Sequence, residues 1–264
     1  MESIALPPFQ TSTAPQEGRG KRPGNLSRPE LSIVMPVYNE DAVIAEVVTT
    51  WIQELERLDI DYEFLVYDDG SEDETGRVLE RLAWQQHGLM VTRKANSGHG
   101  PTILRGYREA IGEWVFQVDS DGEISPEPFP SLWKRRDDYD LLIGRRQHRG
   151  WPLTRRLITA TSRATLRTLF GDAVTDVNAP YRLIRRSSLV AILSMIPDDT
   201  LAPNVIISEL AARSGLRVRE VLVPHRGRRA RTRSIVRWLL WKAAVHAVGQ
   251  TVGVALRGRS RNWR

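Results

Sequence analysis

Four short apolar runs alternate with stretches of helical periodicity between residues 31 and 118, and this alternation constrains the fold more than any other feature. The runs span 31–37, 64–67, 89–92 and 114–118, with helices predicted over 42–58, from 72 onward and over 102–111. In the first helix Val43, Val47, Trp51 and Leu55 recur every four residues and form one apolar face. This alternation predicts an α/β fold: a Rossmann-like, mostly parallel sheet flanked by helices, with ligands at the carboxyl ends of the strands.

Each of the four predicted strands ends in a cluster of polar residues. The clusters are Tyr38, Asn39 and Glu40; Asp68 and Asp69; Arg93, Lys94 and Asn96; and Asp119 and Asp121. One such cluster alone is more often an ordinary loop, because loops are rich in these residue types. The carboxyl ends of parallel strands share one edge of the sheet, so four clusters at that edge favour a site for a polar ligand.

The fourth strand ends most abruptly, because its apolar residues are followed directly by Asp119 and Asp121. Two carboxylates one residue apart suit a hard divalent cation, which prefers oxygen ligands and often also binds substrate phosphate. An isolated Asp-x-Asp is more often a solvated acidic turn, so the motif gains weight from the neighbouring clusters. No Gly-x-Gly-x-x-Gly or Gly-Lys-Ser/Thr motif follows the first strand, which argues against dehydrogenase-type and P-loop sites.

Length and composition fit a globular protein of 264 residues with one large domain or two small ones. Cysteine is absent, which excludes disulfides, thiolate metal sites and a Cys nucleophile, and fits a reducing, cytoplasmic compartment. Residues 1–30 mix Pro, Gly, Ser, Thr and Gln without an apolar core, so we expect a disordered leader rather than a secretory signal. The predicted α/β domain covers 31–234, and a basic amphipathic helix and tail cover 235–264.

The C-terminal part is strongly basic, because from Arg213 onward 14 Lys and Arg stand against one acid, Glu220. Residues 235–256 are mostly apolar, and their polar positions form one narrow stripe. Such a helix fits a membrane interface better than a span across the bilayer, and its arginines suit anionic lipids. The same stripe is also typical of a helix that packs on its own domain or on a second subunit. Nucleic acid is a weaker partner, because apolar residues interrupt the basic ones and no known binding module is present.

In their order, the motifs resemble the family 2 inverting glycosyltransferases, which have the GT-A nucleotide-sugar-binding fold. The resemblance rests on the runs 33–40, 68–71, 96–100 and 119–121 and covers about 31–234. Further segments at 144–146, 151–159, 176–182 and 220–228 are similar to the dolichol-phosphate mannosyltransferase and polyprenyl-phosphate glycosyltransferase branch. The resemblance implies an enzyme that moves a hexose, mannose or glucose, from a GDP or UDP sugar to a polyprenyl (dolichyl-type) phosphate.

The resemblance also implies roles for individual residues. The nucleotide-sugar would be bound by Pro36, Tyr38, Glu40, Asp68, Asp69, Asn96, Gly98 and Asp119, with Arg226 and Arg228 closing over its phosphates. Mg2+ or Mn2+ would be held by Asp119, Asp121 and Glu123, and the catalytic set would be Asp121, Arg146, Arg155 and Thr159, the last three facing the acceptor phosphate. Three positions depart from the branch: Thr159 stands where Ser is usual, Glu123 where Gln is frequent, and 231–234 replaces a smaller Gly-x-Ser turn.

The implied reaction displaces a nucleoside diphosphate from the anomeric carbon of the sugar, with inversion. A polyprenyl phosphate needs no general base, because a phosphate monoester with a second pKa of about 6 is already an oxyanion at neutral pH. Arginines at 145, 146, 149, 155 and 156 suit such a phosphate, since Arg binds phosphate in a bidentate manner. A saccharide or small-molecule hydroxyl acceptor would instead need a base, for which Glu209 and Asp176 are candidates. We therefore expect an enzyme peripherally associated with the cytoplasmic face of a membrane.

Overall fold

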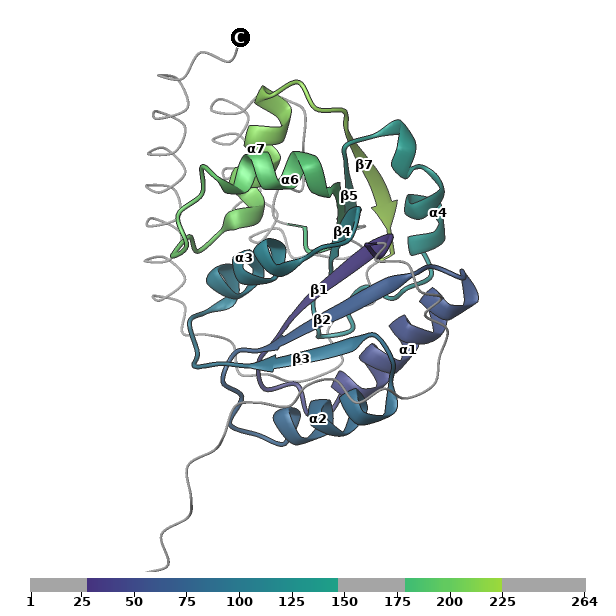
Figure 1. The fold of residues 1–264 in the computed structure, drawn as a ribbon, viewed down its shortest axis with the longest axis vertical. Coiled ribbons are helices and arrows are strands. Elements are labelled where there is room, and N and C mark those ends of the chain that lie inside the picture. Colours follow the sequence, from purple (N-terminus) through teal and green to yellow (C-terminus); the bar gives the residue numbers. More distant parts are fainter. Residues whose placement is uncertain (1–27, 147–178, 225–264) are drawn as a thin grey trace, which may run out of the picture.

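The computed structural model describes residues 28–146 and 179–224, which form a seven-stranded sheet with helices on both faces (Figure 1). The strands are β1 (Leu31–Val37), β2 (Tyr62–Asp68), β3 (Leu89–Arg93), β4 (Trp114–Gln117), β5 (Leu141–Arg146), β6 (Arg182–Arg185) and β7 (Val218–Val223). The helices are α1 (Ile44–Arg57), α2 (Thr75–Gln85), α3 (His99–Glu109), α4 (Phe129–Lys134), α6 (Arg186–Leu193) and α7 (Pro203–Arg213), with a short 3-10 turn η1 (Arg136–Asp138). Across the sheet the strands follow the order β3-β2-β1-β4-β6-β5-β7.

The helices form two layers, one on each face of the sheet (Figure 1). One apolar cluster contains Trp51 of α1, Leu79 of α2 and Phe129 of α4, together with one face of the strands. A second cluster contains Ile103 of α3 and Ile206 of α7, together with residues of α6 and the other face. Both faces of the sheet are therefore buried, which explains why the strands read as almost continuous apolar runs.

The first four strands are parallel, as the sequence predicts. β1 pairs with β2 on one side and with β4 on the other, while β3 pairs with β2. After β3 the chain therefore crosses back over β1 and adds the next strand on the opposite side. Open α/β sheets bind ligands at such a reversal, beyond the carboxyl ends of the strands. The topology therefore predicts a ligand site beyond the carboxyl ends of β1 and β4.

The last three strands include one antiparallel strand. β6 runs antiparallel to both β4 and β5, and β7 runs parallel to β5. Because two reversals restore the direction, β5 and β7 point the same way as β4 and end at the same edge of the sheet. The mostly parallel sheet is confirmed, but its antiparallel strand was not predicted. β6 has only four residues, Arg-Leu-Ile-Arg, and so few residues show no periodicity.

An aromatic cluster packs beneath the end of β4 and joins the two parts of the sheet. The ring of Phe116 on β4 lies 5.2 Å from Trp51, 4.9 Å from Phe129 and 4.8 Å from Tyr181, measured between centroids. Trp51, Phe116, Phe129 and Tyr181 are all essentially inaccessible to solvent. Tilted and edge-on pairs at these distances add to the stability gained from burial alone. The cluster therefore fixes β4 and the segment before β6 relative to one another.

Helix α3 begins at His99, three residues before the predicted start at Thr102. The preceding Gly98 has a φ of 89°, which favours glycine, and it turns the chain into the helix. Gly100 then lies so close to the segment before α7 that an added Cβ would be 2.3 Å from the Thr200 carbonyl oxygen. The early start therefore brings the first turn of α3 against the segment that leads into α7.

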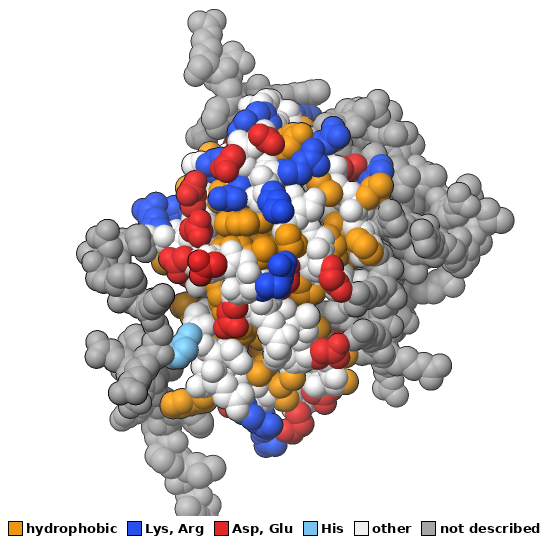
Figure 2. Space-filling view, turned by 90° about the vertical axis from the view of Figure 1, so that its right-hand side faces the viewer, with side chains coloured by type: hydrophobic (Ala, Val, Ile, Leu, Met, Phe, Trp, Pro, Cys, Tyr) orange, Lys and Arg blue, Asp and Glu red, His pale blue; other side chains and the backbone are white. Residues whose placement is uncertain are grey.

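Charged residues of both signs are interspersed among apolar ones on the face shown in Figure 2. On this face the described residues form no continuous basic surface. Most of the basic residues counted after Arg213 come later than Pro224, the last residue that the structure describes.

The predicted leader and tail lie outside the described residues, except for 28–30. Within the two described ranges, no helix is both long enough and apolar enough to cross a membrane. The proposed division into a leader, an α/β domain and a basic tail therefore stays a prediction at both ends.

Candidate active site

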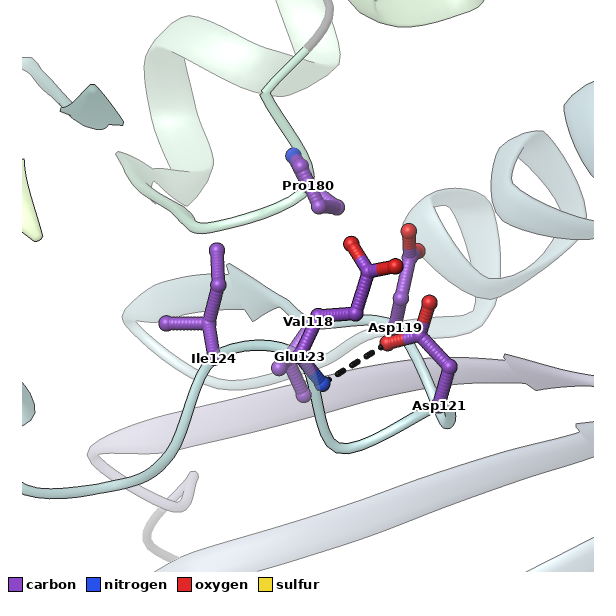
Figure 3. A pocket seen from close by; sticks show the side chains of 6 residues that line it. All are labelled: Val118, Asp119, Asp121, Glu123, Ile124 and Pro180. Carbon is purple, nitrogen blue, oxygen red and sulfur yellow. Dashed lines mark hydrogen bonds between the residues drawn. The ribbon is translucent and has the colours of Figure 1, made fainter. Parts of the chain in front are cut away.

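An acidic pocket lies just beyond the carboxyl end of β4. Its lining consists of Val118, Asp119, Asp121, Glu123, Ile124 and Pro180. In Figure 3 the carboxyl groups of Asp119, Asp121 and Glu123 reach toward the same side, where Pro180 forms the opposite wall. The acids come from the loop after β4, whereas Pro180 belongs to the segment before β6. The pocket therefore forms where the parallel and antiparallel parts of the sheet meet.

Local hydrogen bonds set the directions of the two aspartates. Val118 continues the strand ladder by donating its N–H to the Val34 carbonyl at 3.1 Å, so the turn begins only at Asp119. Asp121 Oδ1 accepts the backbone N–H of Glu123 at 3.0 Å, as Figure 3 shows. Gly122, with a φ of 69°, allows this tight turn. The sequence Asp-Ser-Asp-Gly-Glu thereby places its acids on one side of the loop.

Asp119 is connected both to β4 and to the start of α3. Its Oδ1 accepts a hydrogen bond from the Gln117 side-chain amide at 2.9 Å. The His99 Nε2 at the start of α3 lies 3.6 Å from the same oxygen. The side chain of Asp119 stays 30% exposed, so a ligand in the pocket can reach its carboxylate.

The chemistry of this site fits a divalent cation that is shared with a ligand. Among the described residues, no three His, Asp or Glu side chains are gathered closely enough to hold a metal ion by themselves. Mg2+ is commonly bound by one or two protein carboxylates that act together with substrate phosphates and water. Asp119 and Asp121 supply such a partial oxygen set, and Glu123 extends it. The predicted metal residues therefore fit a cation whose remaining ligands come from a bound diphosphate.

The loop after β1 is fixed to the loop after β2. Asn39 adopts a φ of 52°, donates its backbone N–H to Ser71 Oγ at 3.0 Å and accepts the Glu72 N–H on its side chain at 2.8 Å. The Glu40 backbone N–H donates to Thr75 Oγ1 at 2.8 Å. These bonds leave the ring of Tyr38 exposed at the rim. Pro36 lies within β1 in register with Tyr67 of β2.

The two aspartates after β2 have different surroundings. The buried Asp68 accepts the Ser71 N–H at 2.8 Å and lies 3.5 Å from the Arg93 guanidinium. It lines a separate hollow between α2 and β3, together with Gly76, Trp84 and Arg93, and does not line the acidic pocket. The structure therefore does not bring Asp68 and the metal residues into one pocket.

Asp69 organises the loop between β3 and α3. Its carboxylate accepts the backbone N–H groups of Ser97 at 2.8 Å and Gly98 at 2.9 Å, and it is paired with the Lys94 ammonium. Asn96 belongs to the same loop and lies beside Gly70, where its backbone nitrogen would be 2.9 Å from an added Cβ. The polar clusters after β2 and β3 are thus joined through Asp69, in addition to the contact between Asp68 and Arg93.

The acceptor-side predictions fall largely outside the described residues. Arg155, Thr159, Arg226 and Arg228 lie there, as does Asp176. Arg146 is the last residue of β5, and only its backbone is described. Register nevertheless places it beside Val223 of β7, three residues before Arg226. Since β5 and β7 end at the same edge as β4, this backbone lies on the side of the sheet that carries the acidic pocket.

Glu209, one of two candidate bases, lies on α7 and is not among the residues that line the acidic pocket. It is buried, and its Oε1 lies 3.2 Å from the Arg213 guanidinium. Burial raises the pKa of Glu209 to about 7, although the Arg213 charge partly opposes this shift. Glu209 is therefore a buried carboxyl group with the Arg213 guanidinium beside it.

Sequence reasoning missed a buried polar group that supports the pocket from behind. Gln117, Tyr107, Arg182 and Asn204 are at most 2% exposed and are linked by hydrogen bonds. The one signal in the sequence is Gln117 itself, a polar residue between Phe116 and Val118 in an otherwise apolar strand. A buried amide of this kind needs hydrogen-bond partners.

Comparisons with known proteins agree with this architecture. Residues 32–193, more than half of the chain, match the model of Glycosyl transferase family 2. The chain therefore belongs to that family, and the resemblance seen in its motifs is confirmed.

Among curated proteins the chain is similar to two undecaprenyl-phosphate 4-deoxy-4-formamido-L-arabinose transferases. It is 28% identical to that of Proteus mirabilis (strain HI4320) over 199 residues, 74% of this chain and 60% of the relative. It is 30% identical to that of Sodalis glossinidius (strain morsitans) over 192 residues, 72% of this chain and 58% of the relative. The chain thus spans about 60% of the length of these relatives. Their names agree with the resemblance to the polyprenyl-phosphate branch.

Solved structures show the same fold. Glucosyl-3-phosphoglycerate synthase from Mycobacterium tuberculosis, in complex with Mn2+, UDP-glucose and phosphoglyceric acid, has a TM-score of 0.62 at 20% identity, over 86% of this chain and 80% of that one. Mannosyl-3-phosphoglycerate synthase from Rubrobacter xylanophilus has a TM-score of 0.63 at 16% identity, over 89% and 76%. The predicted GT-A fold is therefore confirmed.

Proposed function

We propose that this chain transfers a sugar from a nucleoside-diphosphate sugar to a polyprenyl phosphate, with Mg2+ or Mn2+ bound at Asp119 and Asp121. The observation that carries the proposal is the acidic pocket beyond β4, at the point where the sheet reverses its order of strands. Family membership and the names of the curated relatives support the same reaction class. The transferred sugar would be a hexose, mannose or glucose, and the donor carries GDP or UDP.

The acids of the pocket explain why a cation is part of the proposal. A diphosphate is repelled by Asp119, Asp121 and Glu123 unless positive charge stands between them. When bound, a divalent cation supplies that charge and neutralises the leaving diphosphate. The role of the chain is to hold the two aspartate carboxylates on one side of the loop. Asp121, kept in place by the Glu123 N–H, is our candidate for the catalytic carboxylate.

The nucleoside would lie along the ends of β1 and β2. Tyr38 offers an exposed ring beside this edge, and the buried Glu40 follows it on the same fixed loop. Asp69 holds the loop that contains Asn96 and Gly98. Pro36 and Asp68 complete the donor-side set that the family resemblance implies. The hydrogen bonds of these loops support a preformed donor site, which reduces the entropy lost when a ligand binds.

The acceptor would approach from the edge where β5 and β7 end. The register of these strands supports this location, because it brings the backbone of Arg146 beside the strand that leads to Arg226. Arg146, Arg155 and Thr159 are our candidates for binding the acceptor phosphate, and Arg226 and Arg228 would close over the phosphates of the donor. A phosphate oxyanion attacks without a general base, so arginines suffice to bind and orient it.

A hydroxyl acceptor is the second candidate function, and one observation favours it. A pKa of about 7 is suitable for a general base, and Glu209 has such a pKa. Against this, Glu209 is buried beside Arg213 and does not line the acidic pocket. Polyprenyl phosphate is therefore our first candidate for the acceptor, ahead of a hydroxyl group.

The membrane side of the proposal rests on the sequence. Residues 235–264 would bind a membrane surface through apolar residues and arginines, and residues 1–30 would be a leader without a catalytic role. The domain over 31–234 would then work at the cytoplasmic face, where it meets its lipid acceptor. Binding of the full chain to vesicles that contain anionic lipid, compared with neutral vesicles, tests this part separately.

The experiment that tests the proposed function is a transfer assay. The purified chain is incubated with labelled GDP or UDP hexoses, with Mn2+ or Mg2+, and with undecaprenyl phosphate or free saccharides. We expect label in the lipid fraction, lost on chelation and restored by the added metal. Label transferred only to saccharides would favour the second candidate, and transfer that survives chelation would contradict the metal assignment.

A further inference from the structure

A continuous chain of hydrogen-bonded side chains runs from the acidic pocket into the core. The Gln117 amide donates to Asp119 Oδ1 at 2.9 Å. The Asn204 amide donates to Gln117 Oε1 at 3.0 Å, and Asn204 Oδ1 accepts the hydroxyl of Tyr107 at 3.1 Å. Three side chains from β4, α7 and α3 thus form a line behind the carboxylate.

The side chains of this hydrogen-bonded chain are all buried except that of Asp119, at its pocket end. Gln117, Tyr107 and Asn204 are 0%, 1% and 2% exposed, whereas the Asp119 side chain is 30% exposed. Buried polar groups are costly unless they are hydrogen-bonded, and here both ends of the Gln117 amide and both ends of the Asn204 amide have partners. The Gln117 amide therefore has its N–H group directed at Asp119, because its oxygen is held by Asn204.

Arg182 fixes the elements that carry this chain. It lies opposite Gln117 in the β4–β6 pairing and is fully buried. Its guanidinium donates to the carbonyl oxygens of Asn204 and Ala179, each at 3.0 Å. Asn204 belongs to the first turn of α7, and Ala179 precedes Pro180, the far wall of the pocket. One buried cation therefore holds both the helix and the wall at fixed positions relative to β4.

We propose that Gln117 and Asn204 are positioning residues for Asp119: they hold its carboxylate in the orientation in which it binds the cation of the donor complex. This inference rests on the proposed function, in which Asp119 is a metal ligand. Partners that hydrogen-bond to ligating carboxylates fix their orientation, and removing such a partner typically weakens metal binding by about 10- to 100-fold. Neither residue would touch the cation or the substrate.

The test is direct binding of Mn2+, measured by calorimetric titration in the presence of the nucleoside diphosphate that the wild type binds. Gln117→Met keeps the length of the side chain but removes its donor to Asp119 and its acceptor for Asn204. We expect its dissociation constant for Mn2+ to rise about tenfold. Asn204→Leu leaves Gln117 in place but frees its amide to turn, so a smaller rise is expected.

A matched control separates positioning from general stability. Ser32 is also fully buried, at the opposite end of the sheet in β1, where it donates to Glu63 and accepts the Gly112 N–H at 2.7 Å. Ser32→Ala should lower the midpoint of thermal unfolding as Gln117→Met does, but leave the dissociation constant for Mn2+ unchanged.

The outcomes are distinct. If the wild type binds no Mn2+ with either nucleotide, the proposed function fails, and this inference fails with it. If the wild type binds Mn2+ but Gln117→Met and Asn204→Leu bind it equally well, the positioning role is overturned while the proposed function stands. If Gln117→Met does not fold, the comparison of Asn204→Leu with Ser32→Ala decides in the same way.

Discussion

The first four strands of the sheet and the last three are assembled in different ways. In the first part the four strands are parallel to one another, and a helix connects each to the next. In the second part β6 is antiparallel, and the chain between β5 and β6 includes residues 147–178, outside the described ranges. Most of the proposed donor residues follow strands of the first part, and the proposed acceptor residues belong to the second. On the proposed assignment, one surface would combine a donor site made from local turns with an acceptor site made from segments that are distant in the sequence.

The largest effect on stability should follow from disrupting the aromatic cluster that joins the two parts of the sheet. Trp51→Ala removes the ring that packs on Phe116, Phe129 and Tyr181, and should lower the free energy of unfolding by about 3–5 kcal/mol. Chemical denaturation followed by circular dichroism and by tryptophan fluorescence measures this loss. If the two probes gave separate transitions in the wild type, the two parts would be independent units, and the role we assign to the junction would be wrong.

The next effect concerns the donor side alone. Asp121→Ala removes one of the three carboxylates of the pocket and should weaken Mn2+-dependent donor binding by about 100-fold. Binding of the lipid phosphate should be nearly unchanged, because its candidate residues, Arg146, Arg155 and Thr159, come from a different part of the sequence. Glu113→Ala, at the opposite end of β4, is the matched control and should leave donor binding intact. Donor affinity that survives in Asp121→Ala would show that the cation is bound elsewhere.

A pH-dependent effect is expected in the second part. Burial raises the pKa of Glu209 to about 7 from its ordinary 4.5, so between these values the folded chain keeps a proton that the unfolded chain releases. The contribution of Glu209 to stability should therefore be fully present below pH 4.5 and be lost as the pH rises to 7, by on the order of 2 kcal/mol. Glu209→Gln should remove this dependence.

Denaturant unfolding of the wild type and of Glu209→Gln from pH 4.5 to 8 measures this difference in the pH dependence of stability.

Glu209→Gln also tests which kind of acceptor the enzyme uses. Transfer to a polyprenyl phosphate should survive in Glu209→Gln, because no general base is needed. Transfer to a saccharide hydroxyl that is present in the wild type and lost in Glu209→Gln, with unchanged folding, would favour the second candidate and make Glu209 its base.

The smallest effect is expected at the loop between β3 and α3. Asp69→Asn exchanges one carboxylate oxygen for an amide nitrogen, so either the Gly98 or the Ser97 N–H loses its acceptor. We expect a loss of about 1–3 kcal/mol in stability and faster hydrogen exchange confined to residues 94–98. Exchange that is unchanged there would show that other contacts hold the loop.

Sequence periodicity predicted the first part well because its rules are local. The limits of β1 were predicted without error, and those of β2, β3 and β4 within two residues. The apolar face of α1 was also predicted, although Ile44 and Val48 are buried where Val43 and Val47 were expected. The antiparallel β6 was missed because four residues carry no period.

The acidic residues of the site could be predicted from the sequence, but the buried residues that hold them in place could not. Asp119 and Asp121 follow an apolar strand directly, and such a change of polarity can be read from the sequence. The partnership of Gln117 with Asn204 joins residues 87 positions apart, and only the packing of α7 on the sheet creates it. The separation of Asp68 from the acidic pocket could not be predicted either, because side chains at neighbouring strand ends can point to opposite faces of a sheet.

The buried Asp69 carboxylate has a consequence for how fast a ligand can bind. Since it already holds the 94–98 loop through Lys94, Ser97 and Gly98, the rim of the donor side is ordered before any ligand arrives. A donor that binds to an ordered loop does not wait for the loop to rearrange. Association should therefore follow a single exponential whose observed rate constant rises linearly with donor concentration. The rate of donor binding would then be limited by diffusion and not by the motion of the loop.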